Sequence, residues 1–106
     1  MGLIKRFKAY ISIKGMRKLA EQDQSGGQYW LGRAYMEGLG VQQDYPEAFF
    51  WLTLAVNNNT NELRSNPELY DALKSAQDFK KQAEQNLTPE QISVVEKRVA
   101  TWKPVK

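Results

Sequence analysis

Residues 37–52 read EGLGVQQDYPEAFFWL, and the order of residue types in this stretch predicts a turn between two helices. Gly38 and Gly40 favour the end of one helix, because glycine readily adopts the left-handed conformation that closes a helix. Asp44 fits the start of the next helix as a cap, and Pro46 fits its first turn, where a missing N–H costs nothing. A phosphate-binding loop would need a preceding strand and further motif residues, so the two glycines predict a structural turn.

Helical periodicity continues on both sides of this turn and predicts an all-α fold of about five helices. We expect helices over residues 3–22 and 26–37, a third beginning near Asp44, a fourth beginning at Pro67 and a last one ending at Pro104. The last helix has the clearest start, because Thr88 is followed by Pro89 and then by Gln91 in the pattern of a capping box. The polar stretch NNNTNELRSN, residues 57–66, is expected to form a loop.

The chain of 106 residues has the length of one domain, and it contains no cysteine and no histidine. A disulfide, a thiolate nucleophile and the commonest general base and metal ligand are therefore excluded. Glu37, Asp44 and Glu47 lie close together in the sequence, but no nucleophile or base accompanies them. Helix capping and the helix dipole account for Asp44 and Glu47. We therefore expect a non-catalytic protein without cofactor or metal.

The basic residues are concentrated at the N-terminus, where residues 1–18 carry six of them and no acid, whereas residues 19–106 carry nine basic and twelve acidic side chains. The basic segment is open to two main interpretations, a helix packed on the domain or an amphipathic helix on a membrane surface. The membrane contacts would then be Lys5, Arg6, Phe7 and Lys8. Nucleic-acid binding is less favoured, because the basic stretch is short and the remainder is acidic. Without a signal peptide or a membrane-spanning stretch, we expect a cytoplasmic protein.

Residues 27–55, GQYWLGRAYMEGLGVQQDYPEAFFWLTLA, resemble one Sel-one-like repeat, a helix–turn–helix relative of the tetratricopeptide repeat. The residues that match the family pattern are Gly27, Tyr29, Leu31, Gly32, Tyr35, Gly38, Gly40, Val41, Asp44, Tyr45, Ala48, Trp51 and Ala55. Residues 15–29 resemble the end of a preceding repeat, with departures at Gly15, Leu19 and Asp23. Residues 87–102 resemble the terminal segment that follows the last repeat in bacterial members of the family.

The resemblance implies a short α-solenoid, a fragment of a tetratricopeptide-like superhelix, that forms a single domain over residues 1–106. Residues 3–22 would be a basic helix and degenerate half-repeat, residues 26–57 one full repeat, and residues 67–103 a two-helix C-terminal cap. Gly32 lies inside a helix, where glycine costs about 0.5–1 kcal/mol relative to alanine. This cost is tolerable if the second helix presses closely against the third, and we expect Trp51 to fill the space opposite Gly32.

The resemblance also implies a protein–protein interaction module, an adaptor or scaffold that binds a protein or peptide on its helical surface. Trp30, Arg33 and Glu37 are the predicted contact residues, because tryptophan and arginine are enriched at interaction hot spots. Tyr29 and Met36 come second, since the N-terminal helix or the cap could cover them instead.

Two further residues, Phe49 and Phe50, lie off the apolar stripe of the third helix. We expect either burial under the fourth helix or a surface for self-association. The open N-terminal end of so short a solenoid also suggests a homodimer. The competing function is that of a peripheral membrane protein that uses the basic N-terminal helix.

Overall fold

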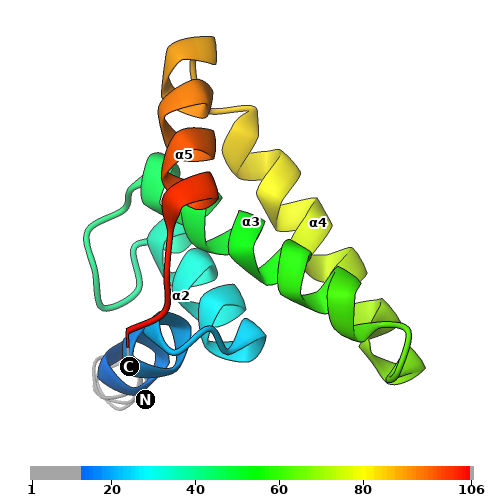
Figure 1. The fold of residues 1–106 in the computed structure, drawn as a ribbon. Coiled ribbons are helices and arrows are strands. Elements are labelled where there is room, and N and C mark those ends of the chain that lie inside the picture. The colour runs from blue at the N-terminus through cyan, green and yellow to red at the C-terminus, as the bar shows by residue number, and fades with distance from the viewer. Residues whose placement is uncertain (1–12, 106) are drawn as a thin grey trace.

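The computed structural model describes residues 13–105, and within that range the fold is all-α with no strand (Figure 1). The helical elements are an N-terminal helical segment over residues 13–21, α2 (Ser25–Glu37), α3 (Tyr45–Glu62), the short 3-10 helix η1 (Pro67–Leu69), α4 (Tyr70–Glu84) and α5 (Pro89–Thr101). The predicted fold class is thus confirmed. Lys5, Arg6, Phe7 and Lys8, the predicted membrane contacts, lie outside the described residues.

Three of the helix ends that the sequence marks are formed as expected, whereas at Pro67 the short 3-10 helix η1 stands first and α4 begins only at Tyr70. Gly38 closes α2 in the left-handed conformation, with φ 69°. The Asp44 side chain accepts a hydrogen bond from the backbone N–H of Glu47 at 3.0 Å and so caps α3. At α5, the N–H of Gln91 donates to Thr88 Oγ1 at 3.2 Å, and the N–H of Thr88 donates to Gln91 Oε1 at 2.9 Å. The capping box is therefore complete.

The expected loop over residues 57–66 is wrong in its first part, because α3 continues to Glu62. Asn58 Nδ2 donates to Asp23 Oδ1 at 2.8 Å and to Gln28 Oε1 at 2.7 Å. Asn59 is only 3% exposed. These tertiary contacts keep in a helix a polar stretch whose intrinsic helix propensity is low.

The central element is α3, which runs through the middle of the fold with α2, α4 and α5 packed around it (Figure 1). Every residue from Ala48 to Val56 is buried. A helix that is apolar on all sides in this way is typical of one enclosed by its neighbours. The burial of α3 has a direct consequence for the two phenylalanines.

Phe49 and Phe50 are 3% and 0% exposed, so they form no surface for self-association. That expectation is overturned, and the alternative of burial is correct. The reason is that two helices cover them rather than the fourth alone. Lys80 of α4 places its Nζ 5.9 Å from the Phe49 ring centre, and Arg98 of α5 places its Cζ 3.7 Å from that of Phe50.

The close approach expected at Gly32 is present, but its neighbour is not the one predicted. A Cβ atom added to Gly32 would lie 2.6 Å from Leu52 Cγ and 3.3 Å from the carbonyl oxygen of Ala48. Trp51 lies one residue, or about 100°, around α3, and its ring instead makes an edge contact with Trp102 at 6.3 Å between centroids. Leu52 therefore occupies the space that the sequence analysis assigned to Trp51.

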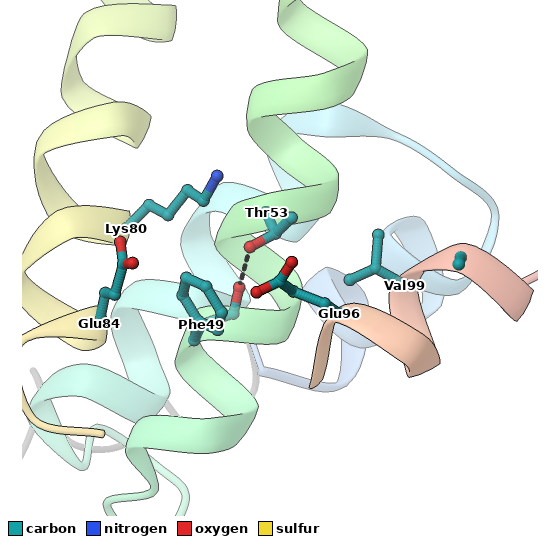
Figure 2. A pocket seen from close by; sticks show the side chains of 7 residues that line it. Phe49, Thr53, Lys80, Glu84, Glu96 and Val99 are labelled. Carbon is teal, nitrogen blue, oxygen red and sulfur yellow. Dashed lines mark hydrogen bonds between the residues drawn. The ribbon is translucent and has the colours of Figure 1, made fainter. Parts of the chain in front are cut away.

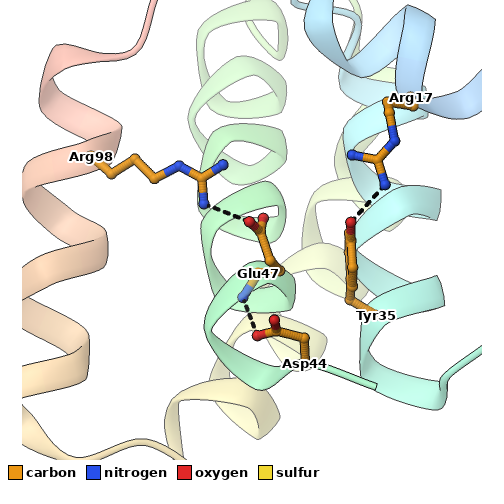
Figure 3. A network of polar contacts seen from close by, with 5 residues as sticks. All are labelled: Arg17, Tyr35, Asp44, Glu47 and Arg98. Atoms are coloured by element: carbon orange, nitrogen blue, oxygen red, sulfur yellow. Dashed lines mark hydrogen bonds and ion pairs between the residues drawn. The ribbon is translucent and has the colours of Figure 1, made fainter. Parts of the chain in front are cut away.

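The two ends of the described chain are tied together. The backbone N–H of Val105 donates to the carbonyl oxygen of Glu21 at 2.7 Å. Arg17 donates to the hydroxyl of Tyr35 at 2.6 Å, which joins the N-terminal helical segment to α2 (Figure 3).

Candidate functional site

The predicted contact residues on α2 share one face of that helix. Trp30, Arg33 and Glu37 are spaced by three and four residues, which places them next to one another along the helix. Trp30 is 49% exposed, in agreement with the exposure that a predicted contact residue is expected to have. Arg33 differs from that expectation, since only 26% of its side chain is exposed. Its guanidinium is partly covered by aromatic rings.

Three aromatic rings surround the Arg33 guanidinium. Its Cζ lies 4.6 Å from the ring centre of Phe79, 5.0 Å from that of Trp30 and 5.8 Å from that of Tyr29. The Tyr29 ring also makes edge contacts with Trp30 and Phe79, at 5.2 and 6.0 Å between centroids. We refer to Tyr29, Trp30, Arg33 and Phe79 as the aromatic–arginine cluster. Cation–π contacts of this kind hold the guanidinium in place.

The hydrogen-bonding capacity of Arg33 is largely unused. One terminal nitrogen donates to Glu37 Oε1, and the distance of 3.5 Å is at the outer limit for a hydrogen bond. Its Nε is buried and has no partner among the described residues. Because a guanidinium carries five N–H donors, a second acceptor could bind to Arg33 alongside Glu37 or in its place.

A hollow of about 290 Å³ adjoins the aromatic–arginine cluster. Its lining comes from α2, α3, η1 and α4, and consists of Ser25, Gly26, Tyr29, Trp30, Asn59, Leu69 and Ala72. We call it the Trp30 hollow. Tyr29 and Trp30 belong to both the cluster and the hollow, so an occupant of the hollow would lie close to Arg33.

The two remaining predicted contact residues, Met36 and Tyr29, are both half-buried. Met36 is half-buried and packs against the core, so it is not grouped with the cluster. Tyr29 is half-buried as well, although its ring still lines the hollow. Phe79, Leu69 and Ala72 also lie at this surface, and the sequence pattern does not predict them there. Phe79 lies at the edge of the apolar face of its helix, but nothing in the sequence pairs that edge with α2.

A second groove, of about 380 Å³, lies where α3, α4 and α5 meet (Figure 2). Figure 2 shows Lys80 and Glu84 on α4 and Glu96 on α5 around a floor of Phe49 and Thr53. The Thr53 hydroxyl is satisfied within its own helix, since it donates to the carbonyl oxygen of Phe49 at 2.6 Å. With acidic and basic groups mixed on its walls, this groove selects no single ligand charge.

The carboxylates near the turn have structural partners. Figure 3 shows that Asp44 caps α3 and that Glu47 Oε1 accepts a hydrogen bond from Arg98, at 2.9 Å. Glu37 pairs with Arg33. Within residues 13–105, no three or more acidic side chains come together in a way that could hold a metal ion.

None of the helices described is both long enough and apolar enough to cross a bilayer.

Comparison with protein-family models matches residues 25–59 to the Sel1 repeat. The matched range begins with α2 and ends inside α3, so it includes the turn from which the sequence analysis started. Comparisons with curated proteins and with solved structures found no match.

Proposed function

Because residues 25–59 form a Sel1 repeat, a helical repeat that generally mediates protein–protein interaction, we propose that this chain is a non-catalytic adaptor or scaffold. It binds another protein or a peptide through the outer face of α2. The observation that carries the proposal is Trp30, which leaves half of its surface exposed beside Arg33. Tryptophan and arginine are the residue types most enriched among interface hot spots.

The proposed surface is also held by packing contacts on both faces of α2, which favours binding because less conformational freedom is lost on association. The opposite face of α2 is anchored in the core, with Leu31 and Gly32 buried against α3. On the outer face, Tyr29 and Arg33 hold the Trp30 ring from two directions. A partner would therefore meet a preformed surface.

The experiment that tests this function is a pull-down from cell extract, with the tagged protein as bait. Trp30→Ala/Arg33→Ala should recover much less of any specific partner, since truncation of a hot spot typically weakens binding by about thirtyfold or more. Tyr70→Ala/Val94→Ala is the matched control, because both residues are exposed apolar side chains outside the cluster and the hollow. Equal recovery by all three baits would contradict the assignment of the surface.

Two features of the architecture belong to the same proposal. Residues 3–22 would be a degenerate half-repeat and residues 67–103 a C-terminal cap, and the packing of α4 and α5 on α3 supports the second assignment.

A second copy of the chain is one candidate partner, with contact at the N-terminal end. Analytical ultracentrifugation over a range of concentrations tests this, and a monomer throughout would exclude the homodimer.

A second candidate function, attachment to a membrane surface, is favoured by the six basic residues without an acid in residues 1–18. Co-sedimentation with vesicles that contain anionic lipid should be lost in Lys5→Glu/Arg6→Glu/Lys8→Glu. If the triple substitution leaves co-sedimentation unchanged, residues 1–18 do not attach the protein to the membrane.

A further inference from the structure

We infer that the partner presents a carboxylate to Arg33 and an apolar side chain to the Trp30 hollow, from one extended peptide segment. The inference rests on the proposed function, because it names the chemistry of the partner bound at the same surface.

The unused hydrogen-bond donors of Arg33 point to an acidic partner. Arg33 is the one basic residue of α2, and its only charged neighbour on that helix is Glu37. The two groups lie 3.5 Å apart and Glu37 is exposed, so solvent screens the attraction between them. A carboxylate of the partner can therefore replace Glu37 at little cost. An incoming carboxylate has two oxygens that match the planar fork of a guanidinium, and it can accept from two N–H groups at once.

The aromatic rings prepare Arg33 for this role. The Phe79 and Trp30 ring centres lie 4.6 and 5.0 Å from the guanidinium carbon, and Nε is buried. An incoming acceptor therefore meets the two terminal nitrogens, one of which already donates to Glu37. The rings also displace water, and a charge-assisted hydrogen bond gains strength where the local dielectric constant is low. A polymer of phosphates fits less well than a single carboxylate, because residues 19–106 carry nine basic and twelve acidic side chains and would repel it.

The hollow sets the second requirement. Its volume of about 290 Å³ lies just below the roughly 300–1,000 Å³ of small-molecule sites, which suits one side chain of a peptide. Tyr29, Trp30, Leu69 and Ala72 give it an apolar lining. An aliphatic or aromatic side chain would bury its surface there.

The distance between the two subsites limits the separation of the two side chains in a peptide that runs along α2. The α2 part of the hollow extends from Ser25 to Trp30, and its middle lies five to six residues before Arg33, or about 8 Å along the helix at about 1.5 Å per residue. An extended peptide advances about 3.3 Å per residue. The apolar residue and the acidic residue are therefore two or three positions apart.

The test uses mixtures of fluorescently labelled ten-residue peptides in which a leucine and an aspartate stand three positions apart and the other positions vary. Three matched mixtures replace the aspartate with asparagine, the aspartate with phosphoserine, or the leucine with alanine. By fluorescence polarisation, the leucine–aspartate mixture should bind about tenfold or more tightly than the asparagine and alanine mixtures. Arg33→Gln should abolish the preference for aspartate over asparagine.

A further pair of variants tests the hollow without disturbing the cluster. Ala72→Phe places a large side chain at its rim and should reduce binding of the leucine–aspartate mixture to the level of the alanine mixture. Ala100→Phe makes the same change in the groove between α4 and α5, and should leave binding unchanged. Circular dichroism of each variant establishes that the helical fold is kept.

The contrary outcomes separate the inference from the proposed function. Equal binding of the aspartate and asparagine mixtures, or tighter binding of the phosphoserine mixture, would overturn the carboxylate assignment. If no mixture binds while Trp30→Ala/Arg33→Ala still loses a partner in the pull-down, the peptide chemistry is wrong and the binding surface stands. If neither experiment depends on Trp30 and Arg33, both proposals fail.

Discussion

Gly27 is the position where a single methyl group should do the most damage. A Cβ atom added there would lie 2.6 Å from Leu19 Cβ, 2.8 Å from the backbone nitrogen of Ala20 and 2.9 Å from the carbonyl oxygen of Met16. Two of these three atoms are backbone atoms, so no change of rotamer relieves the overlap. In Gly27→Ala, the N-terminal helical segment must therefore move away from α2.

The neighbouring glycine allows the size of this effect to be isolated. Gly26 lies in the same first turn of α2, but a Cβ atom there would meet nothing within 4 Å. Both substitutions gain about 0.5–1 kcal/mol from the higher helix propensity of alanine. Only Gly27→Ala also suffers the overpacking, which typically costs about 1–3 kcal/mol. The free energies of unfolding of the two variants should therefore differ by about 1–3 kcal/mol, with Gly26→Ala the more stable.

Urea unfolding followed by circular dichroism measures this difference directly. Hydrogen exchange adds a local measurement, since amide protection over residues 13–21 should fall in Gly27→Ala and stay unchanged in Gly26→Ala. If the two variants unfold at the same urea concentration with equal protection over that segment, the close packing of the N-terminal helical segment on α2 is refuted.

Substitutions at three further contacts are tested by urea unfolding. Thr88→Ala removes the cap of α5 and should lower the free energy of unfolding by about 0.5–2 kcal/mol, and no loss would mean that the capping box does not stabilise the helix. Leu52→Ala should cost about 2–5 kcal/mol, and Gly32→Ala should be less harmful in that background than in the wild type, because the new methyl group occupies the vacated space. Additive effects would contradict the contact between these two residues. Asp23→Ala should lower the free energy of unfolding by about 1 kcal/mol or more, because Asp23 has φ 66° and accepts a hydrogen bond from Asn58. Asp23→Asn should lower it less, since asparagine tolerates the left-handed conformation.

The features predicted correctly from the sequence depend on neighbours close in the chain. Gly38 ends its helix and Asp44 and Thr88 begin theirs through contacts with residues no more than a few positions away. Such signals act through local backbone geometry and local hydrogen bonds, which the order of residue types is enough to specify.

The errors arose where distant residues decide the outcome. The segment after Val56 is helical because Asn58 finds acceptors on Asp23 and Gln28, about thirty positions earlier. Phe49 lies off the expected apolar stripe, so the sequence left both burial and self-association open; it is buried because later helices cover α3. For the same reason, the sequence predicts Trp30 and Arg33 as contact residues but does not show that Phe79 of α4 lies beside Arg33.

The two sides of α3 differ in how well they are packed, and this difference bears on where a partner can bind. Toward α2, the absence of a side chain at Gly32 brings the two backbones together over Leu52. Toward α5 less is buried, because Val95 is the one buried residue of α5, whereas five residues of α2 are buried. The contact of α5 with α3 is therefore the easier one to open, whereas α2 is held firmly. A binding surface gains affinity when it is fixed before the partner arrives, and the outer face of α2, which carries Trp30 and Arg33, stands on the better-packed side of the central helix.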